Sequence, residues 1–420
     1  MVRKILHSKI MIFIIIIFVI LFPFTINMPD QTQSYSVVLG VGVDKADEGY
    51  EISTQILTSK ANQGFLETLQ VHSAKGKNVL DCVEELSLHL GRISGFGNTS
   101  VIVFSEDVAK DGIAETLDFF LRSKRLNGNP FIVVTKNKAK EILSDAAKID
   151  ESFNYNLNSL AKLNKDFANG TIMTMENFLN NFYSGTTASV ISQINQTNND
   201  FDGVMIPDTN SQSSSGGANG GSSSSEGQNA GGSEGGETRV LSNKGDSSVF
   251  IGSKQIATID AYIVEGMNTL ISTKRNSYTI NNVSDEYFHN ATVVLSQKNS
   301  YLTRVLKFSP NGIPRIYFNI KYTLKVEQVL QDGINQVILD GSQNYMTPTL
   351  QQKIQENIKG QASESLNLFK ELNADVYGFQ QAFYKHHPKK WQKFLDGLDD
   401  KNEAFKKIEV FAKIQLKGNL

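Results

Sequence analysis

The sequence predicts an α+β protein, in which an N-terminal membrane anchor is followed by three mixed α/β domains. The last domain is expected to combine an antiparallel-rich sheet with a long helix. Three observations support this prediction. An uncharged apolar run occupies 10–26, strand patterns alternate with helix patterns over 36–146, and a long alternating strand at 315–327 precedes an amphipathic helix at 349–372. Strands alternating with helices of about 10–15 residues are typical of layered α/β structures.

The apolar run at 10–26 contains 17 residues without a charge, and Arg3, Lys4 and Lys9 precede it. As a helix it would extend about 25 Å, just enough to cross a bilayer core. Because basic flanks stay in the cytoplasm, the bulk of the chain is expected on the outer face of the membrane. Residues 1–33 are therefore expected to form a cytoplasmic basic flank and a transmembrane anchor. A cleaved signal peptide is the alternative, although the run ends without the small residues that a signal peptidase prefers.

The composition excludes several classes of function. The chain has 41 Lys and Arg residues, 43 Asp and Glu residues and a net charge of −2, which argues against nucleic-acid binding through a basic surface. Cys82 is the only cysteine, so neither an internal disulfide nor a cysteine-built zinc site is possible. Cys82 shares an apolar helical face with Val79, Val83 and Leu86. This position favours core packing over a reactive or intermolecular role.

The first domain is expected at 36–146. A buried strand at 35–43 and an alternating strand at 50–57 suggest a hairpin. Gly40 and Gly42 have no third glycine opening a helix after them, so close backbone packing is favoured over dinucleotide binding. The later elements are an amphipathic helix at 77–90 ended by Gly91, a strand at 100–104, a helix capped by Ser105 with Val108, Ile113, Leu117, Phe120 and Leu121 on one side, a strand at 131–134 and a short helix at 138–143.

The second domain is expected at 150–285 and contains a segment predicted to be disordered. Residues 211–236 include 18 Gly or Ser residues out of 26, which bury too little surface to offset the entropy of ordering. The segment could link two domains or form a loop inserted between two strands of one domain. The strand-like flanks at 189–194 and 248–251 favour the insertion. The other predicted elements are a helix at 175–183, paired strands within 249–259 around 252–254, and a strand at 261–264.

The third domain is expected at 286–420. Within the strand at 315–327, Ile316, Phe318 and Ile320 begin an alternation that is typical of an antiparallel strand with one buried face. The further elements are strands at 292–295, 302–308, 336–339 and 406–416, the long helix at 349–372, and a second helix opened by Pro388.

No catalytic, cofactor-binding or metal-binding residues are predicted. The sequence lacks a G-x-S-x-G elbow, a phosphate-binding loop and an H-E-x-x-H helix. No two of the six histidines are four residues apart, and the adjacent His386 and His387 have diverging side chains, so surface or capping roles are favoured. Trp391 is the only tryptophan, and core or interface packing is favoured over ligand stacking. The protein is accordingly not expected to be an enzyme.

The segment DVYGF at 375–379, followed by His387, Pro388 and Trp391, resembles the C-terminal domain of the Ger(x)C family. Members of this family are the C subunits of nutrient germinant receptors in endospore-forming bacteria. The long helix before this segment and the final strand after it also match the family's order. Gly378 in this segment is expected to need either a positive φ or a close backbone approach.

Two further stretches are similar to the family. Residues 249–274 resemble a stretch in which a strand, a turn with lysine and a glutamate-containing helix succeed one another, and residues 36–45 with 112–126 resemble the N-terminal domain. The resemblance therefore covers nearly the whole chain after the anchor. Family members are usually lipoproteins with a cysteine after the apolar signal, whereas this chain has Met28 and no nearby cysteine. An uncleaved helix would have to replace the lipid anchor.

The resemblance implies three α+β domains and a non-catalytic, membrane-anchored subunit of a nutrient germinant receptor. Such a subunit would lie on the outer face of the spore inner membrane beside two multi-pass membrane subunits, without cofactors and without nucleic acid. A membrane-anchored extracytoplasmic protein that binds a small molecule is the alternative. An anchored cell-wall hydrolase would need paired carboxylates or a metal site, and the sequence shows neither.

Overall fold

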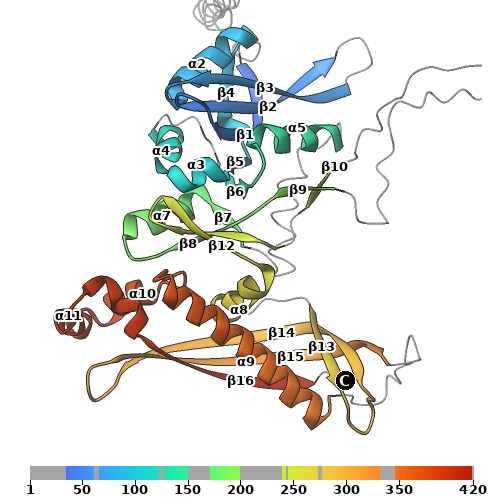
Figure 1. Cartoon of the computed structure of the whole chain (residues 1–420), viewed down its shortest axis with the longest axis vertical. Coiled ribbons are helices and arrows are strands. Elements are labelled where there is room, and N and C mark those ends of the chain that lie inside the picture. The colour runs from blue at the N-terminus through green and yellow to red at the C-terminus, as the bar shows by residue number, and fades with distance from the viewer. Residues whose placement is uncertain are drawn as a thin grey trace, which may run out of the picture.

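The computed structural model describes residues 35–60, 66–122, 126, 128–149, 171–198, 239–242, 245–272, 277–331 and 346–418. Figure 1 shows a larger sheet with its helices at one end of the molecule, a small sheet in the middle and a second large sheet with a long helix at the other end. The expected anchor at 10–26, the segment at 211–236 and the strand expected at 336–339 lie outside the described residues. No helix in the described ranges is long and apolar enough to cross a membrane.

The N-terminal sheet has seven strands in the order β3-β2-β1-β5-β6-β7, with β4 also paired to β1. The hairpin expected from the first two runs is confirmed, since β1 and β2 are antiparallel. The strand β3 was not expected from the sequence, and it pairs with β2 along its whole length. The strands are β1 Tyr35–Lys45, β2 Tyr50–Lys60, β3 Leu66–Gly76, β4 Ile93–Gly95, β5 Val101–Ser105, β6 Phe131–Thr135 and β7 Met173–Thr174.

Helices cover both faces of this sheet. They are α2 Val79–Leu90, α3 Glu106–Asp111, α4 Ala114–Arg122 and α5 Ala139–Ile149. The helix α5 packs on one face, where Leu143 lies 3.0 Å from the position that a Cβ on Gly40 or Gly42 would take. The interpretation of these glycines as sites of close packing is therefore confirmed. The helices α2, α3 and α4 pack with α7 (Met175–Ser184) on the other face, over buried side chains of the sheet that include Phe104.

The single helix capped by Ser105, as expected from the sequence, is wrong. The side chain of Ser105 makes no capping hydrogen bond. The chain breaks at Gly112, whose φ is +127°, so that α3 and α4 are separate helices. The break places Ile113 against the turn between two later strands, and its N–H donates to the carbonyl of Ser253 at 3.0 Å. Leu121, which was expected on the buried side, is 47% exposed.

The middle of the chain forms a three-stranded sheet in the order β12-β11-β8 and a separate β9–β10 pair. The elements are β8 Ser189–Ser192, β9 Asn195–Asn198, β10 Arg239–Ser242, β11 Ser247–Ile251, β12 Lys254–Ile259 and α8 Ala261–Ile271. Strands on the two sides of 211–236 pair with each other, both β8 with β11 and β9 with β10. A loop inserted within one domain requires such pairing between its flanks. The boundaries of the three domains stay a prediction.

The strand expected at 261–264 is wrong, because these residues begin the helix α8. Asp260 caps this helix, and its side chain accepts a hydrogen bond from the N–H of Ile263 at 3.0 Å. Ile263, Val264 and Met267 then recur at helical spacing on the buried face. The resemblance to the Ger(x)C stretch did indicate a helix here, whereas the short apolar run by itself suggested a strand.

The C-terminal sheet has the order β13-β14-β15-β16 and is antiparallel except for the parallel pair β15–β16. The strands are β13 Ser277–Val283, β14 Ala291–Phe308, β15 Pro314–Leu330 and β16 Glu409–Gly418. The two strands expected at 292–295 and 302–308 form the single strand β14. Its pairing with β15 shifts register near Leu295 and Asn299, and these irregularities break the alternation that the sequence analysis followed.

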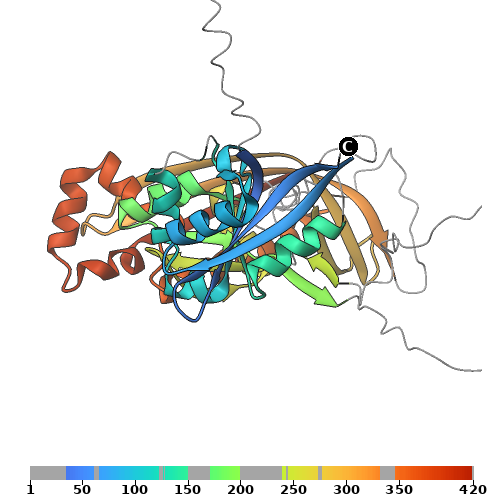
Figure 2. The same ribbon diagram turned by 90° about the horizontal axis from the view of Figure 1, so that it is seen from above.

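The long helix α9 (Pro348–Glu371) lies on one face of this sheet, as expected. Two shorter helices follow it, α10 Phe379–His386 and α11 Pro388–Asp396, of which α10 was not expected. They extend beyond the N-terminal sheet at one end of the molecule in both views (Figures 1 and 2). Lys401–Lys407 forms a 3-10 helix, so the final strand begins at Glu409 rather than at residue 406.

Candidate functional site

The DVYGF segment at 375–379 connects the long helix α9 to α10. Asp375 is 1% exposed, and its carboxylate accepts hydrogen bonds from the N–H groups of Phe379 at 3.0 Å and Gln380 at 2.8 Å. These donors belong to the first turn of α10, where backbone N–H groups have no partner within the helix. Gly378 precedes the helix with a φ of +63°. A Cβ there would meet only Thr187, at 4.0 Å, so this glycine serves a positive φ rather than a close approach.

The same segment joins the two halves of the chain. The carbonyl of Asp375 accepts a hydrogen bond from the N–H of Ala188 at 3.1 Å. Ala188 directly precedes β8 of the middle sheet. The side chain of Gln380 also donates to the carbonyl of Thr186 at 3.4 Å. The C-terminal sheet is therefore tied to the middle sheet through the turn that caps α10.

Burial controls the electrostatics of this segment. Burial raises the pKa of Asp375 from 3.8 to about 6, and the backbone donors around the carboxylate oppose this rise. Burial also raises the pKa of Tyr377, whose ring stacks on Phe379 with centroids 4.9 Å apart. Both groups lie in the core of the C-terminal half rather than in an open cleft. Burial in this core therefore explains the raised pKa values of both groups.

The single tryptophan closes the core at the end of this region. Trp391 is 4% exposed and stacks on Phe383 of α10, with centroids 5.6 Å apart and an interplanar angle of 12°. His387 ends α10 and precedes Pro388 at the start of α11. The interpretation of Trp391 as a core residue is confirmed. His387 lies at the boundary between the two helices, where its backbone N–H donates to the carbonyl of Phe383 at 2.8 Å but its side chain makes no capping hydrogen bond.

The helices α8 and α9 cross at a very short distance. A Cβ on Gly266 would lie 2.3 Å from the backbone oxygen of Gln361. The amide of Gln361 donates to the carbonyl of Tyr262 at 3.1 Å and to the carboxylate of Glu265 at 2.8 Å. The sequence analysis missed this crossing, although a glycine within the apolar pattern of 261–271 is a recognisable signal of close approach.

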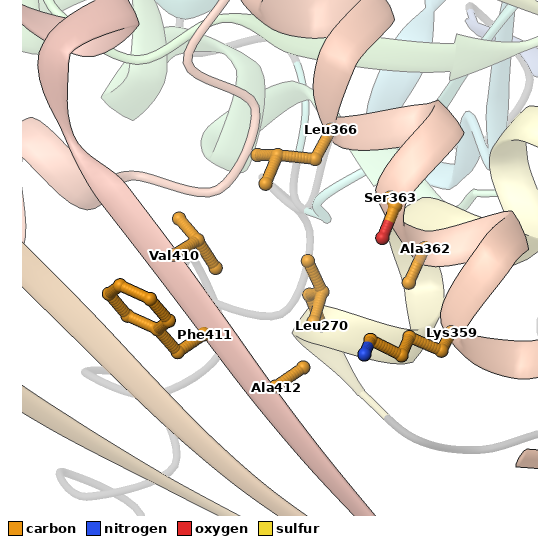
Figure 3. A pocket seen from close by; sticks show the side chains of 8 residues that line it. All are labelled: Leu270, Lys359, Ala362, Ser363, Leu366, Val410, Phe411 and Ala412. Atoms are coloured by element: carbon orange, nitrogen blue, oxygen red, sulfur yellow. The ribbon is translucent and has the colours of Figure 1, made fainter.

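A pocket of about 200 Å³ opens beside this crossing. Figure 3 shows Lys359, Ser363 and Leu366 projecting from α9 towards Val410 and Ala412 of β16, with Leu270 of α8 between them. The lining is mainly apolar, and the polar side chains are those of Lys359 and Ser363. Pockets that enclose small organic ligands are usually about 300–1,000 Å³. This pocket is smaller than that range, so it does not by itself support the small-molecule alternative.

The strand β16 forms one edge of the C-terminal sheet. Among the described residues, no strand pairs with its free side. The face of the sheet opposite α9 is uncovered, and it carries a stack of Tyr317 on Phe411 with centroids 5.1 Å apart. These two rings are 37% and 45% exposed. Two residues earlier on the same pair of strands, Arg315 and Glu409 form an ion pair at 2.6 Å. The pocket, the free edge and this face together form the candidate site, an interaction surface.

The second pocket of note lies between α2 and α4. Its volume is about 450 Å³, and its polar lining includes Glu115, Asp118 and Arg122. Arg122 and Asp118 pair with each other at 2.5 Å, so two of these charges are already neutralised. The apolar lining includes Leu80 and Phe119. Among the described residues, no buried polar side chain without a hydrogen-bond partner lines this pocket.

The structure places the other residues singled out from the sequence away from this surface. Cys82 is fully buried in the core beneath the N-terminal sheet, as predicted, and burial raises the pKa of its thiol to about 11. His89 pairs with Glu85 at 3.0 Å on an exposed face. Within the described ranges, no group of three or more His, Cys, Asp or Glu side chains is placed to hold a metal ion.

Two family models match the chain on either side of the glycine- and serine-rich segment. The N-terminal domain of spore germination proteins matches residues 31–196. The domain described as spore germination B3/GerAC-like, C-terminal, matches residues 246–417. The second match contains the DVYGF segment, the pocket and nearly all of β16.

The chain belongs to the Ger(x)C family of spore germination proteins.

Individual relatives of this Ger(x)C chain are distant in sequence. It is 20% identical to spore germination protein KC of Bacillus subtilis (strain 168) over 411 residues, which cover 95% of this chain and 92% of that protein. It is 24% identical to putative spore germination protein YfkR of the same organism over 133 residues, which cover 29% of this chain and 35% of that protein. The crystal structure of the GerBC protein matches with 12% identity and a TM-score of 0.48, over 91% of this chain and 97% of that chain.

The geometry gives the Ger(x)C resemblance at 375–379 a physical basis. Asp375 caps a helix, Tyr377 stacks within the core, and Gly378 provides the left-handed turn between them. The segment was identified from the sequence by resemblance alone, and its roles as helix cap, core contact and turn were not predicted. The free edge at β16 was also missed. Lys413 and Lys417 were a signal for it, because lysines on the exposed face are typical of edge strands.

Proposed function

We propose that this Ger(x)C protein is a non-catalytic subunit of a nutrient germinant receptor and acts in spore germination through contacts with other subunits. One observation carries the proposal, which is that family models of spore germination proteins match both halves of the chain, 31–196 and 246–417. The similarity to spore germination protein KC over nearly its full length supports the same role. A subunit that only stabilises a receptor assembly or passes on a conformational change needs no catalytic residues.

The chemistry of the described residues is compatible with this role. The strongly perturbed groups are Cys82, Asp375 and Tyr377, and each is shifted by burial in a core. Perturbed groups at catalytic sites usually lie in a cleft that a substrate can enter. The exposed features of the C-terminal half include an uncovered sheet face and, among the described residues, a free strand edge. These are the features of a binding surface.

The proposal includes a membrane anchor at 10–26, with the described domains on the outer face of the spore inner membrane beside two multi-pass subunits. The support is the uncharged run after Arg3, Lys4 and Lys9. Extraction of membranes at alkaline pH tests the anchor. The intact chain should stay with the membrane, and a chain lacking residues 1–33 should be released. Release of both would show that the segment does not anchor the protein.

Deletion of the gene in its host tests the role. Spores lacking the protein should lose the response to one class of nutrients and still germinate by a route that bypasses nutrient receptors. A normal response to every nutrient, in a strain that also lacks paralogues of the protein, would refute the proposed function. Capture of multi-pass membrane proteins with the tagged chain would identify the partners.

A further inference from the structure

The C-terminal sheet ends at β16, which has no strand partner on one side among the described residues and an uncovered outer face. The strand β16 pairs with β15 through ten residue pairs, from Glu409 to Gly418, and its other side carries backbone N–H and C=O groups without a strand partner among the described residues. A free edge of this length is a ready template for another strand. Proteins that use such an edge bind an extended segment, with main-chain hydrogen bonds supplying affinity and side-chain pockets supplying specificity.

The pocket lies where the side chains of an added strand would point. Val410, Ala412, Ile414 and Leu416 face the helix layer and are only partly buried. The end of α8 at Leu270 faces β16 across the pocket, beside Leu366 of α9 (Figure 3). A fifth strand beside β16 would therefore lie below α8 and place every second side chain against this apolar lining.

The charge around the edge defines the partner. Lys413 and Lys417 are exposed on the outer face of β16, and Lys321 lies opposite Gln415 on the neighbouring strand. Lys359 lines the pocket on the helix side. None of these four lysines pairs with a carboxylate of the described residues. The one carboxylate on β16, Glu409, is already engaged by Arg315 at 2.6 Å.

We propose that the free edge of β16 binds an extended segment of another protein chain, in which apolar side chains facing the pocket alternate with acidic side chains facing Lys321, Lys413 and Lys417. A second copy of this chain fits less well, because it would bring its own Lys413 and Lys417 to the same edge. The inference rests on the proposed function to the extent that a receptor subunit has partner chains. It identifies where and by what chemistry one of them is held.

The binding test uses the full-length protein in detergent and labelled ten-residue peptides, matched to the length of β16. One peptide alternates valine with glutamate, a second alternates valine with lysine, and a third is the acidic peptide with alternate backbone amides methylated. Fluorescence anisotropy should show binding of the acidic peptide alone. Amide exchange along β16 should slow when that peptide is bound. Binding of the methylated peptide equal to the acidic one would refute strand addition.

Two protein variants test the site. Lys413→Glu with Lys417→Glu should weaken binding of the acidic peptide by about tenfold or more and allow the basic peptide to bind. The matched control is Lys385→Glu with Lys389→Glu, which changes the charge equally at exposed positions of α10 and α11 and should change affinity by less than about twofold. Ser363→Trp, at an exposed position of the pocket lining, should also weaken binding. Equal losses in the site and control variants would show general charge attraction and refute the proposal.

The remaining outcomes separate this proposal from the proposed function. If the wild-type protein binds no peptide although deletion abolishes a nutrient response, the edge proposal is wrong and the proposed function stands. If light scattering shows a dimer in solution that Ser363→Trp disrupts, the occupant is a second copy and the proposal is overturned. If the peptide binds as expected and deletion has no effect on germination, the edge is a binding site in a protein of another function.

Discussion

The two large sheets of the molecule differ in how they are covered. The N-terminal sheet has α5 on one face and α2, α3, α4 and α7 on the other, so that all five residues of β5 are buried. The C-terminal sheet has α9 on one face only, and β15 alternates along most of its length between buried and more exposed residues. Both sheets end in a strand with one unpaired side among the described residues, β3 in the first and β16 in the second. The uncovered face therefore distinguishes the C-terminal sheet and leaves it more surface for contact with a partner.

The largest expected effect lies in the covered sheet. Phe104→Ala should lower the free energy of unfolding by about 3–5 kcal/mol, since truncation of a buried phenylalanine leaves a cavity. Phe104 of β5 is 0% exposed, and Val43 and Val134 flank it on the neighbouring strands. Reactivity of Cys82, buried under the same sheet, measures the effect during urea unfolding. A loss below about 1 kcal/mol would mean that this sheet is not the rigid part of the molecule.

The next effect concerns the tie between the halves and depends on pH. The pKa of Asp375 is raised from 3.8 to about 6 by burial, so the folded chain holds its proton more tightly than the unfolded chain. This group therefore makes the free energy of unfolding fall as pH rises from about 4 to about 6. Asp375→Asn stays neutral and should lose that dependence. Relative to the wild type, the variant should gain roughly 2–3 kcal/mol between pH 4 and pH 7.

Urea unfolding followed by the fluorescence of Trp391, the only tryptophan, measures this change in the C-terminal half. The absolute stability of the variant should be lower at pH 4, because a single amide oxygen replaces the two carboxyl oxygens that accept from the N–H groups of Phe379 and Gln380. Asp399→Asn is the matched control at an exposed position of the same half. Parallel pH curves for the wild type and the Asp375 variant would contradict the assignment.

A smaller effect is expected at the crossing of α8 and α9. Gly266→Ala places a Cβ 2.3 Å from the backbone oxygen of Gln361, so the helices must move apart at a cost of about 1–3 kcal/mol. Gly360→Ala on α9 is the matched control, because nothing lies within 4 Å of its Cβ position. The control should be neutral or stabilising by up to about 1 kcal/mol. If both variants shift the tryptophan transition alike, the crossing is not as close as described.

Local patterns in the sequence predicted most elements of both sheets. The alternation of Ile316, Phe318 and Ile320 predicted the strand β15, and the helical spacing of apolar residues around Cys82 predicted the helix α2. The failures have physical causes. The strand β3 has few apolar residues and owes its place to pairing with β2. The run at 261–264 is too short to distinguish a strand from a helix without its cap, Asp260.

The candidate site was less predictable than the fold, because it consists of relations between distant residues. Val410 and Leu366 line one pocket only after α9 packs on the sheet. The free edge at β16 depends on the order of the strands, which no local pattern contains. The segment at 375–379 was found by resemblance alone, and its cap on α10 became visible only from the geometry. The sequence alone indicated a protein that acts through contacts with partner subunits, without indicating which residues make those contacts.

The smallest expected effect lies on the uncovered face and provides the sharpest comparison with Phe104. Phe411→Ala removes a ring that is 45% exposed and stacks on Tyr317. The loss in free energy of unfolding should be about 0.5–1 kcal/mol, because the ring gives up a stacking contact and little buried area. Urea unfolding followed by Trp391 fluorescence measures it. A loss near that of Phe104→Ala would mean that something covers Phe411 in the folded protein. The two sheets would then be equally closed, and the case for an interaction surface on the C-terminal half would fail with that result.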